Sequence, residues 1–166
     1  ARADLRGRVP GLHEPGASLA RMAVGGEDVT RCLAAPKRAV PGHGVGHQLL
    51  IHEQPQRIAK KVNPWPLVAG NIMTIEPGYY LADRYGIRIE NQVEVVESQP
   101  GFCRFSSLTL VPIDLSQVEW TLLSDEEKQW LDTYHQQVRD TLLPLVDSDA
   151  RAWLETATAP VCVYPR

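Results

Sequence analysis

The chain has 166 residues and a formal net charge of −3 at pH 7, so it suits one domain with a core of its own. No basic block is present that would hold a nucleic acid or an anionic membrane surface, and no apolar run approaches the ~20 residues of a membrane-spanning helix. The three cysteines are widely spaced and form neither a CxxC metal pattern nor a disulfide framework, which predicts reduced thiols in a cytoplasmic protein.

The first 41 residues differ from the rest of the chain. They are rich in Arg, Gly, Pro and Ala, hold few long apolar side chains, and show neither the alternation of a strand nor the periodicity of a helix. We expect loops or poorly ordered chain over residues 1–41 and a folded part over residues 42–166.

The middle of the sequence predicts a series of β-strands. A short strand is expected at HQLLIHE, followed by a loop at KKVNPWPLVAGN, because proline discourages both helices and strand interiors. NIMTIEPGYY is the next strand, ended by Pro77-Gly78, and LADRYG is a turn. A further strand is expected at FCRFSSLTLVPID, where Pro112 stops it.

The clearest strand is GIRIENQVEVVE, between the turn and the last strand. Apolar and polar side chains alternate along it, so each kind occupies one face. The apolar face carries Ile87, Ile89, Val93 and Val95, and the polar face carries Arg88, Glu90, Gln92 and Glu94.

The last part of the chain predicts two helices. Ser124 and Glu127 have the spacing of a capping box at the start of a helix. Its apolar stripe consists of Leu131, Tyr134, Val138 and Leu142. Pro144 closes or kinks this helix, and a shorter one is expected at DARAWLETAT. Together these elements predict an α+β fold, with an antiparallel sheet and helices packed on one side of it.

Three of the five histidines lie in the segment GHGVGHQLLIHE. On a strand, the spacing of His43 and His47 would put both on one face, and the glycines at 44 and 46 make a helix unfavourable. The segment does not contain HExxH, so a zincin-type metalloprotease helix is not supported. Taken singly, these histidines are also compatible with ordinary surface or hydrogen-bonded residues.

Two glutamates follow in the strand segments. Glu76 ends an apolar strand, where a carboxylate is costly to bury without a cation or a strong donor, and Glu90 alternates with Arg88 on a polar face. One interpretation is an exposed sheet face with an Arg–Glu pair. The other is a divalent metal held by one histidine and two glutamates, a ligand set that suits manganese, cobalt, iron or zinc better than calcium. Spacing alone leaves both open.

The ordered motifs GHGVGH, IHE, MTIEPGYY and YGIRIEN closely resemble the catalytic domain of the pita-bread metallopeptidases of family M24, specifically the Xaa-Pro aminopeptidases. The segments SSLTLVPIDLSQVEW, LLSDEEKQWLDTYHQQV and WLETATAP resemble the C-terminal end of the three-domain aminopeptidases P. The resemblance implies the C-terminal half of a pita-bread fold. It also implies release of an N-terminal residue from a peptide with proline at the second position.

The resemblance further implies a metal site. It makes His47, Glu76 and Glu90 metal ligands, with Glu90 shared between two divalent ions, usually Mn²⁺. Such ions lower the pKa of bound water, polarise the scissile carbonyl and stabilise the oxyanion.

The remaining implied roles concern the substrate. His43 and His52 match histidines that line the substrate pocket and assist proton transfer. Arg88 matches an arginine beside the bridging glutamate, and Tyr80 an aromatic hydroxyl near the site.

The complete family site needs two more aspartates, eleven positions apart. GGEDVTRCLA resembles the segment that holds the second, with Asp28 as its match, but Ala17 stands at the place of the first. In FSSLTL, Ser106 stands where the family often has a glutamate. We therefore expect the second half of a pita-bread domain behind an unrelated or scrambled start. An uncovered sheet face would favour association with a second copy, and two-metal hydrolysis would be impaired or absent.

The first hypothesis is a partial Xaa-Pro aminopeptidase. A second is a non-catalytic interaction or assembly module derived from the same fold, and a third is a mononuclear metal-binding protein. Metal stoichiometry and proline-dependent cleavage distinguish the three.

Overall fold

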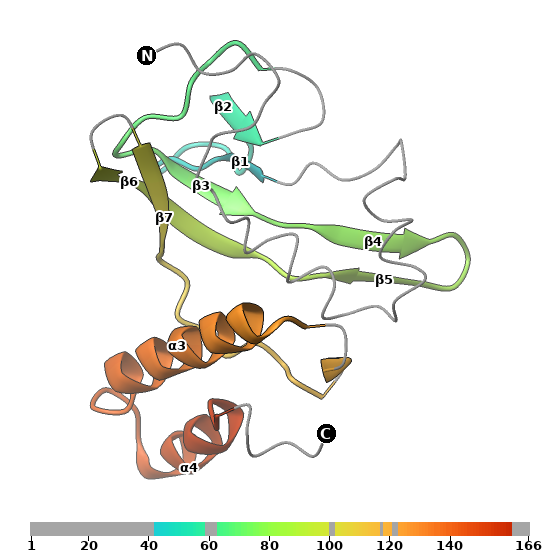
Figure 1. Cartoon of the computed structure of the whole chain (residues 1–166), viewed down its shortest axis with the longest axis vertical. Coiled ribbons are helices and arrows are strands. Elements are labelled where there is room, and N and C mark those ends of the chain that lie inside the picture. Colours follow the sequence, from blue (N-terminus) through green and yellow to red (C-terminus); the bar gives the residue numbers. More distant parts are fainter. Residues whose placement is uncertain (1–41, 59–62, 100–101, 117, 121–122, 161–166) are drawn as a thin grey trace. The chain divides into compact units, whose positions relative to one another are not determined.

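The structure of the chain is a computed structural model that describes residues 42–58, 63–99, 102–116, 118–120 and 123–160 (Figure 1). The described residues up to Thr109 form one compact unit, and those from Leu110 onward form another. The segment 1–41, with Ala17 and Asp28, lies outside the described residues.

The first unit consists of antiparallel β-strands. A five-stranded sheet has the order β2-β1-β3-β6-β7, and β4 pairs with β5 in a separate two-stranded sheet. The strands are β1 (Gly42–Gly44), β2 (Glu53–Ile58), β3 (Ile72–Ile75), β4 (Gly78–Leu81), β5 (Tyr85–Arg88), β6 (Asn91–Gln99) and β7 (Phe102–Ser107). The predicted antiparallel sheet is confirmed.

The predicted strand at HQLLIHE is wrong, because the chain turns there. β1 ends at Gly44, and Gln48 has a left-handed backbone with a φ of 55°. Strand pairing resumes near Glu53, whose carboxylate accepts a hydrogen bond from the backbone N of Leu50 at 2.6 Å. The side chains of residues 49–51 are exposed, so this apolar run belongs to a loop and not to a buried strand.

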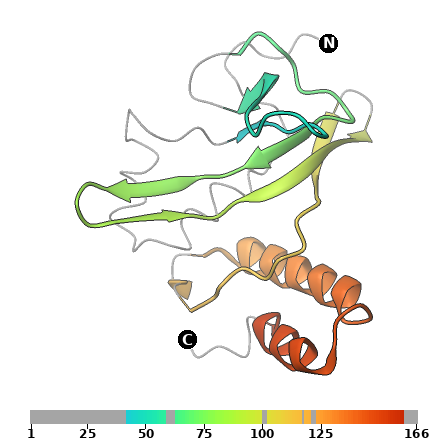
Figure 2. The ribbon, with the colours of Figure 1, turned by 180° about the vertical axis from the view of Figure 1, so that it is seen from behind.

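The four strands β3, β4, β5 and β6 form one long hairpin. Ile75 faces Asn91 where β3 pairs with β6, and Gly78 faces Arg88 where β4 pairs with β5. The two pairings have the same register, because no residue is inserted or skipped between them. Figure 2 shows β3 continuing into β4 and β5 into β6 as a two-stranded ribbon that turns at residues 82–84.

The two strand pairs are joined by two facing segments, residues 76–77 and 89–90, each of which contains one of the two glutamates. Between these segments the backbone N of Ile89 donates to the carbonyl O of Pro77 at 3.4 Å, in the register of the pairs on either side. Glu76 therefore lies opposite Glu90. Residues that face each other in an antiparallel pair project to the same side, so the two carboxylates share one face of the hairpin.

The other face of the hairpin carries the core of this unit. Met73, Ile75, Val93 and Val95 are buried and pack together. Partly buried side chains from neighbouring segments pack against them: Ile58, Leu67, Cys103 and Phe105. The alternation predicted for GIRIENQVEVVE thus places Val93 and Val95 in the core, and removal of this apolar surface from water stabilises the sheet.

The second unit contains two helices, α3 (Asp125–Leu142) and α4 (Ser148–Ala157). The predicted capping box is confirmed: Ser124 accepts from the backbone N of Glu127, whose carboxylate accepts from the backbone N of Ser124. The buried face of α3 consists of Leu131, Tyr134, His135 and Val138. Among the described residues, no helix combines the length and the apolar character that a membrane span requires.

Candidate metal centre

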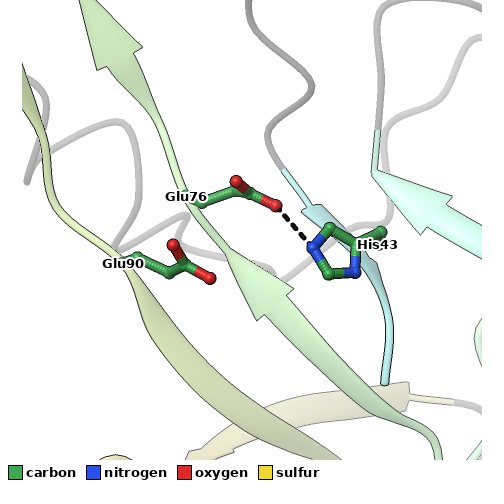
Figure 3. Close-up of side chains that lie close together, drawn as sticks. All are labelled: His43, Glu76 and Glu90. Atoms are coloured by element: carbon green, nitrogen blue, oxygen red, sulfur yellow. Dashed lines mark ion pairs between the residues drawn. The ribbon is translucent and has the colours of Figure 1, made fainter. Parts of the chain in front are cut away.

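Three side chains of the first unit bring possible metal ligands together. His43 is on β1, Glu76 follows β3 and Glu90 precedes β6. One ligand atom of each lies within 4.8 Å of the others (Figure 3). The long hairpin supplies both carboxylates from its polar face, and β1, the neighbour of β3, supplies the imidazole.

Glu76 is buried, with only 6% of its surface exposed, and both of its oxygens have partners. Oε1 accepts from the hydroxyl of Thr74 at 2.9 Å and lies 2.9 Å from Nε2 of His43. Oε2 lies 3.0 Å from Nη1 of Arg88. These contacts supply the donors and the cation that a buried carboxylate requires.

His43 is also buried, and its orientation is fixed by the backbone. Nδ1 lies 2.9 Å from the carbonyl O of Gly44. Because a carbonyl oxygen only accepts hydrogen bonds, Nδ1 carries the hydrogen, and Nε2 is the nitrogen directed at Glu76. In a protonated imidazole Nε2 donates to the carboxylate. In a neutral one its lone pair is available to a cation, as is usual for metal-binding histidines whose second nitrogen is hydrogen-bonded.

His47 does not join this group. It is exposed and lies in the turn that follows β1. The expectation that His43 and His47 share a strand face is wrong, because the strand ends at Gly44. Metal binding by His47 stays a prediction, and the histidine that the structure brings beside both glutamates is His43.

The other predicted site residues surround the same group. The ring of His52 meets the ring of His43 edge-on, with 4.5 Å between the centroids, although His52 itself is exposed. The guanidinium of Arg88 lies 5.6 Å from the centre of the Tyr80 ring. A Cβ on Gly78 or Gly86 would overlap this tyrosine ring, so the two glycines let Tyr80 lie flat along the hairpin face.

Known proteins are similar to this chain in both sequence and fold. The profile of metallopeptidase family M24 matches residues 13–97, and that of the C-terminal region of peptidase M24 matches residues 101–161. The chain belongs to metallopeptidase family M24. The family match begins at residue 13, so the expectation that the start of the chain is unrelated to the family is wrong from that residue onward.

Two curated relatives of this chain are named as aminopeptidases. A probable Xaa-Pro aminopeptidase P of Coprinopsis cinerea is 41% identical over 131 residues, which are 72% of this chain and 21% of that protein. A Xaa-Pro aminopeptidase of Caenorhabditis elegans is 43% identical over 131 residues, again 72% of this chain and 21% of the relative. The chain thus spans about a fifth of the length of these relatives.

The crystal structure of an X-prolyl aminopeptidase from Caenorhabditis elegans superposes with a TM-score of 0.71 and 36% sequence identity. The match covers 89% of this chain and 27% of that chain, which is described as a cytosolic enzyme with a di-nuclear active site. This likeness confirms the predicted α+β, pita-bread fold.

The donor set of this M24 chain fits a divalent metal. One imidazole nitrogen and two carboxylates converge, which suits manganese, iron, cobalt or zinc. Glu76 and His43 are buried, whereas Glu90 is exposed. The group therefore has two ligands held in the interior and a third that is accessible to solvent.

Sequence reasoning did not single out Thr74, whose hydroxyl contacts both His43 and Glu76. The available signal is its position two residues before Glu76, which puts both side chains on one face of the same strand.

Proposed function

We propose that this chain is the metal-binding part of a Xaa-Pro aminopeptidase, which removes the N-terminal residue of a peptide with proline at the second position. The observation that carries the proposal is the convergence of His43, Glu76 and Glu90 within 4.8 Å in a chain of family M24. The names of its relatives support the substrate class.

We propose His43, Glu76 and Glu90 as the ligands of a divalent ion, with Mn²⁺ as its identity. When bound, such an ion lowers the pKa of water and polarises the peptide carbonyl. The family resemblance assigns the imidazole ligand to His47 instead. The burial of His43 and the contact of its Nε2 with Glu76 favour His43.

Other side chains of the group would serve the substrate. His52 is exposed beside His43, so its imidazole is accessible to a peptide and can donate or accept a proton there. Arg88 balances the charge of Glu76, and the Tyr80 hydroxyl offers a hydrogen bond close to the same hairpin face. These residues orient the peptide and hold the carboxylates in place.

A second metal ion would require aspartates from outside the described residues. Asp28 is one candidate, and the Caenorhabditis elegans relative is described as di-nuclear. With one ion per chain and no proline-dependent cleavage, the chain would be a mononuclear metal-binding protein. With no ion at all, it would be a non-catalytic module of the same fold.

The test combines metal analysis with an activity assay on the full 166-residue chain. The chain is purified without chelator, its manganese content is measured by elemental analysis, and cleavage of an Arg-Pro-Pro peptide is followed. Glu90→Gln should lose both the metal and any cleavage. Glu94→Gln, on β6 and on the same face of the hairpin as Glu90 but outside the ligand group, should keep both. Cleavage that survives Glu90→Gln would contradict the proposal.

We further propose a cytoplasmic location and self-association. The Caenorhabditis elegans relative is described as cytosolic. The exposed apolar side chains of residues 49–51 offer surface that a second copy could cover. Light scattering across a concentration series distinguishes a dimer from a monomer.

A further inference from the structure

Thr74 lies on β3, two residues before Glu76, and its side chain is almost completely buried, with 2% exposed. Its hydroxyl contacts two of the proposed metal ligands. We propose that Thr74 is a positioning residue of the metal centre, which fixes the carboxylate of Glu76 and the backbone of His43 before any metal binds. This inference rests on the proposed metal-binding function.

The chemistry of the two hydrogen bonds fixes their direction. The backbone N of His43 lies 3.1 Å from Oγ1 of Thr74 and can only donate. The hydroxyl therefore accepts from β1 through a lone pair. Its single hydrogen is then free to point at Oε1 of Glu76, 2.9 Å away. A carboxylate accepts such a bond, and bonds of this charge-assisted kind are stronger than neutral ones.

The same hydroxyl thus joins two strands that meet closely. β1 pairs with β3 through Gly44 and Met73. A Cβ on Gly42 would overlap the carbonyl O of Thr74, so the glycine permits this approach. Without the hydroxyl, the link between the His43 backbone and the Glu76 carboxylate would be lost.

The consequence for Glu76 is a restricted carboxylate. Thr74 holds Oε1 on one side, and Arg88 holds Oε2 on the other. Groups that do not bind the metal therefore fix the plane of the carboxylate. The Glu76 side chain then loses less conformational entropy when a metal binds. Groups that orient metal ligands in this way typically change metal affinity about 10- to 100-fold when they are removed.

Threonine combines two properties that substitutions can separate. Valine keeps the branched shape that suits a strand but removes the hydroxyl, and serine keeps the hydroxyl but removes the methyl group. Thr158 offers a matched control. It is equally buried, its hydroxyl donates to the carbonyl O of Leu154, and it lies in the other unit.

Mn²⁺ binding to the full chain is measured by electron paramagnetic resonance titration for the parent, Thr74→Val, Thr74→Ser and Thr158→Val. We expect Thr74→Val to weaken Mn²⁺ binding about 10- to 100-fold. Thr74→Ser should recover most of the affinity, and Thr158→Val should bind like the parent. Equal affinity of Thr74→Val and the parent would overturn the inference, as would Thr74→Ser binding as weakly as Thr74→Val.

A second measurement on the metal-free chain separates this inference from the proposed function. Thr74→Val leaves the backbone N–H of His43 without its acceptor, so hydrogen exchange at this amide should accelerate in Thr74→Val and return to the parent rate in Thr74→Ser. If the parent chain binds no Mn²⁺, the metal-binding function fails. Unchanged exchange at His43 would then also refute the positioning role of Thr74, whereas accelerated exchange would support it.

Discussion

The guanidinium of Arg88 lies 3.0 Å from the carboxylate of Glu76, and the two residues occupy the same face of one hairpin. The carboxylate is buried, but about half of the arginine side chain is exposed. Arg88 therefore supplies the positive charge that Glu76 needs in the metal-free chain, at a position where solvent weakens the pair.

Replacement of Arg88 by Gln should destabilise the metal-free chain, because Glu76 then stays buried without a full positive charge. We expect a loss of roughly 1–2 kcal/mol of unfolding free energy in urea titration. Saturating Mn²⁺ should reduce the deficit, since the cation replaces the missing charge. Arg84→Gln, in the turn of the same hairpin, is the control and should have little effect. A deficit that Mn²⁺ leaves unchanged would argue against metal binding at Glu76.

Substitution of the two histidines by Ala distinguishes the possible imidazole ligands. His43→Ala should abolish Mn²⁺ binding, because the structure places this ring beside both glutamates. His47→Ala should bind Mn²⁺ like the parent, because this side chain is exposed in a turn. Circular dichroism checks that both variants fold. Loss of binding in His47→Ala alone would restore the assignment made from the family resemblance.

Acidification should destabilise the second unit through His135, which is fully buried on α3. Its Nε2 accepts from the backbone N of Ile113 at 3.0 Å, which requires the unprotonated nitrogen. Burial lowers the pKa of His135 below its ordinary value of 6.5. The negative charge of Asp132 acts in the opposite direction, and the positive charge of Arg139 lowers the pKa further.

The sign follows from proton binding. Below pH 6.5 the unfolded chain binds a proton at His135 that the folded chain does not yet bind, so acid favours unfolding. Stability should be full above pH 6.5 and fall as the pH decreases, by at most about 1.4 kcal/mol per pH unit. His135→Gln, whose side-chain oxygen can accept from Ile113, should show a flatter profile in thermal melts. Identical profiles for both proteins would exclude His135 as the source.

Removal of the helix cap should cost stability without affecting the metal centre. Ser124→Ala removes the hydroxyl that accepts from the backbone N of Glu127, and we expect a loss of about 1 kcal/mol in urea titration. Ser148→Ala, at an exposed position just inside α4, is the matched control and should lose less. Mn²⁺ affinity should be equal in both variants, because neither residue lies in the unit that holds the ligands.

The sequence predicted those parts of the fold that produce a residue pattern over several neighbouring positions. The alternation along β6 identified Val93 and Val95 as core residues, and the spacing of Ser124 and Glu127 identified the start of α3. Glu76 and Glu90 could be named as a candidate pair because carboxylates beside apolar strand residues require partners. Each of these inferences depends on neighbours in sequence.

The remaining features depend on where strands end and how they pair. His47 does not share a strand face with His43 because β1 ends at Gly44. No residue pattern in the sequence predicted that end. The exposed loop at residues 49–51 has the composition of a buried strand. The hydroxyl of Thr74 becomes relevant only because β1 lies against β3, a pairing between segments far apart in the sequence.

The single register of the long hairpin makes the distant turn at residues 82–84 responsible for the spacing of the two carboxylates. Asp83 adopts a left-handed backbone there, with a φ of 59°. One residue added to or removed from this turn would shift every later partner by one position. Glu90 would then project to the opposite, apolar face of the sheet, and Ile89 after an addition or Asn91 after a removal would face Glu76. The length of an exposed turn is therefore as strictly constrained as the identity of the ligands themselves.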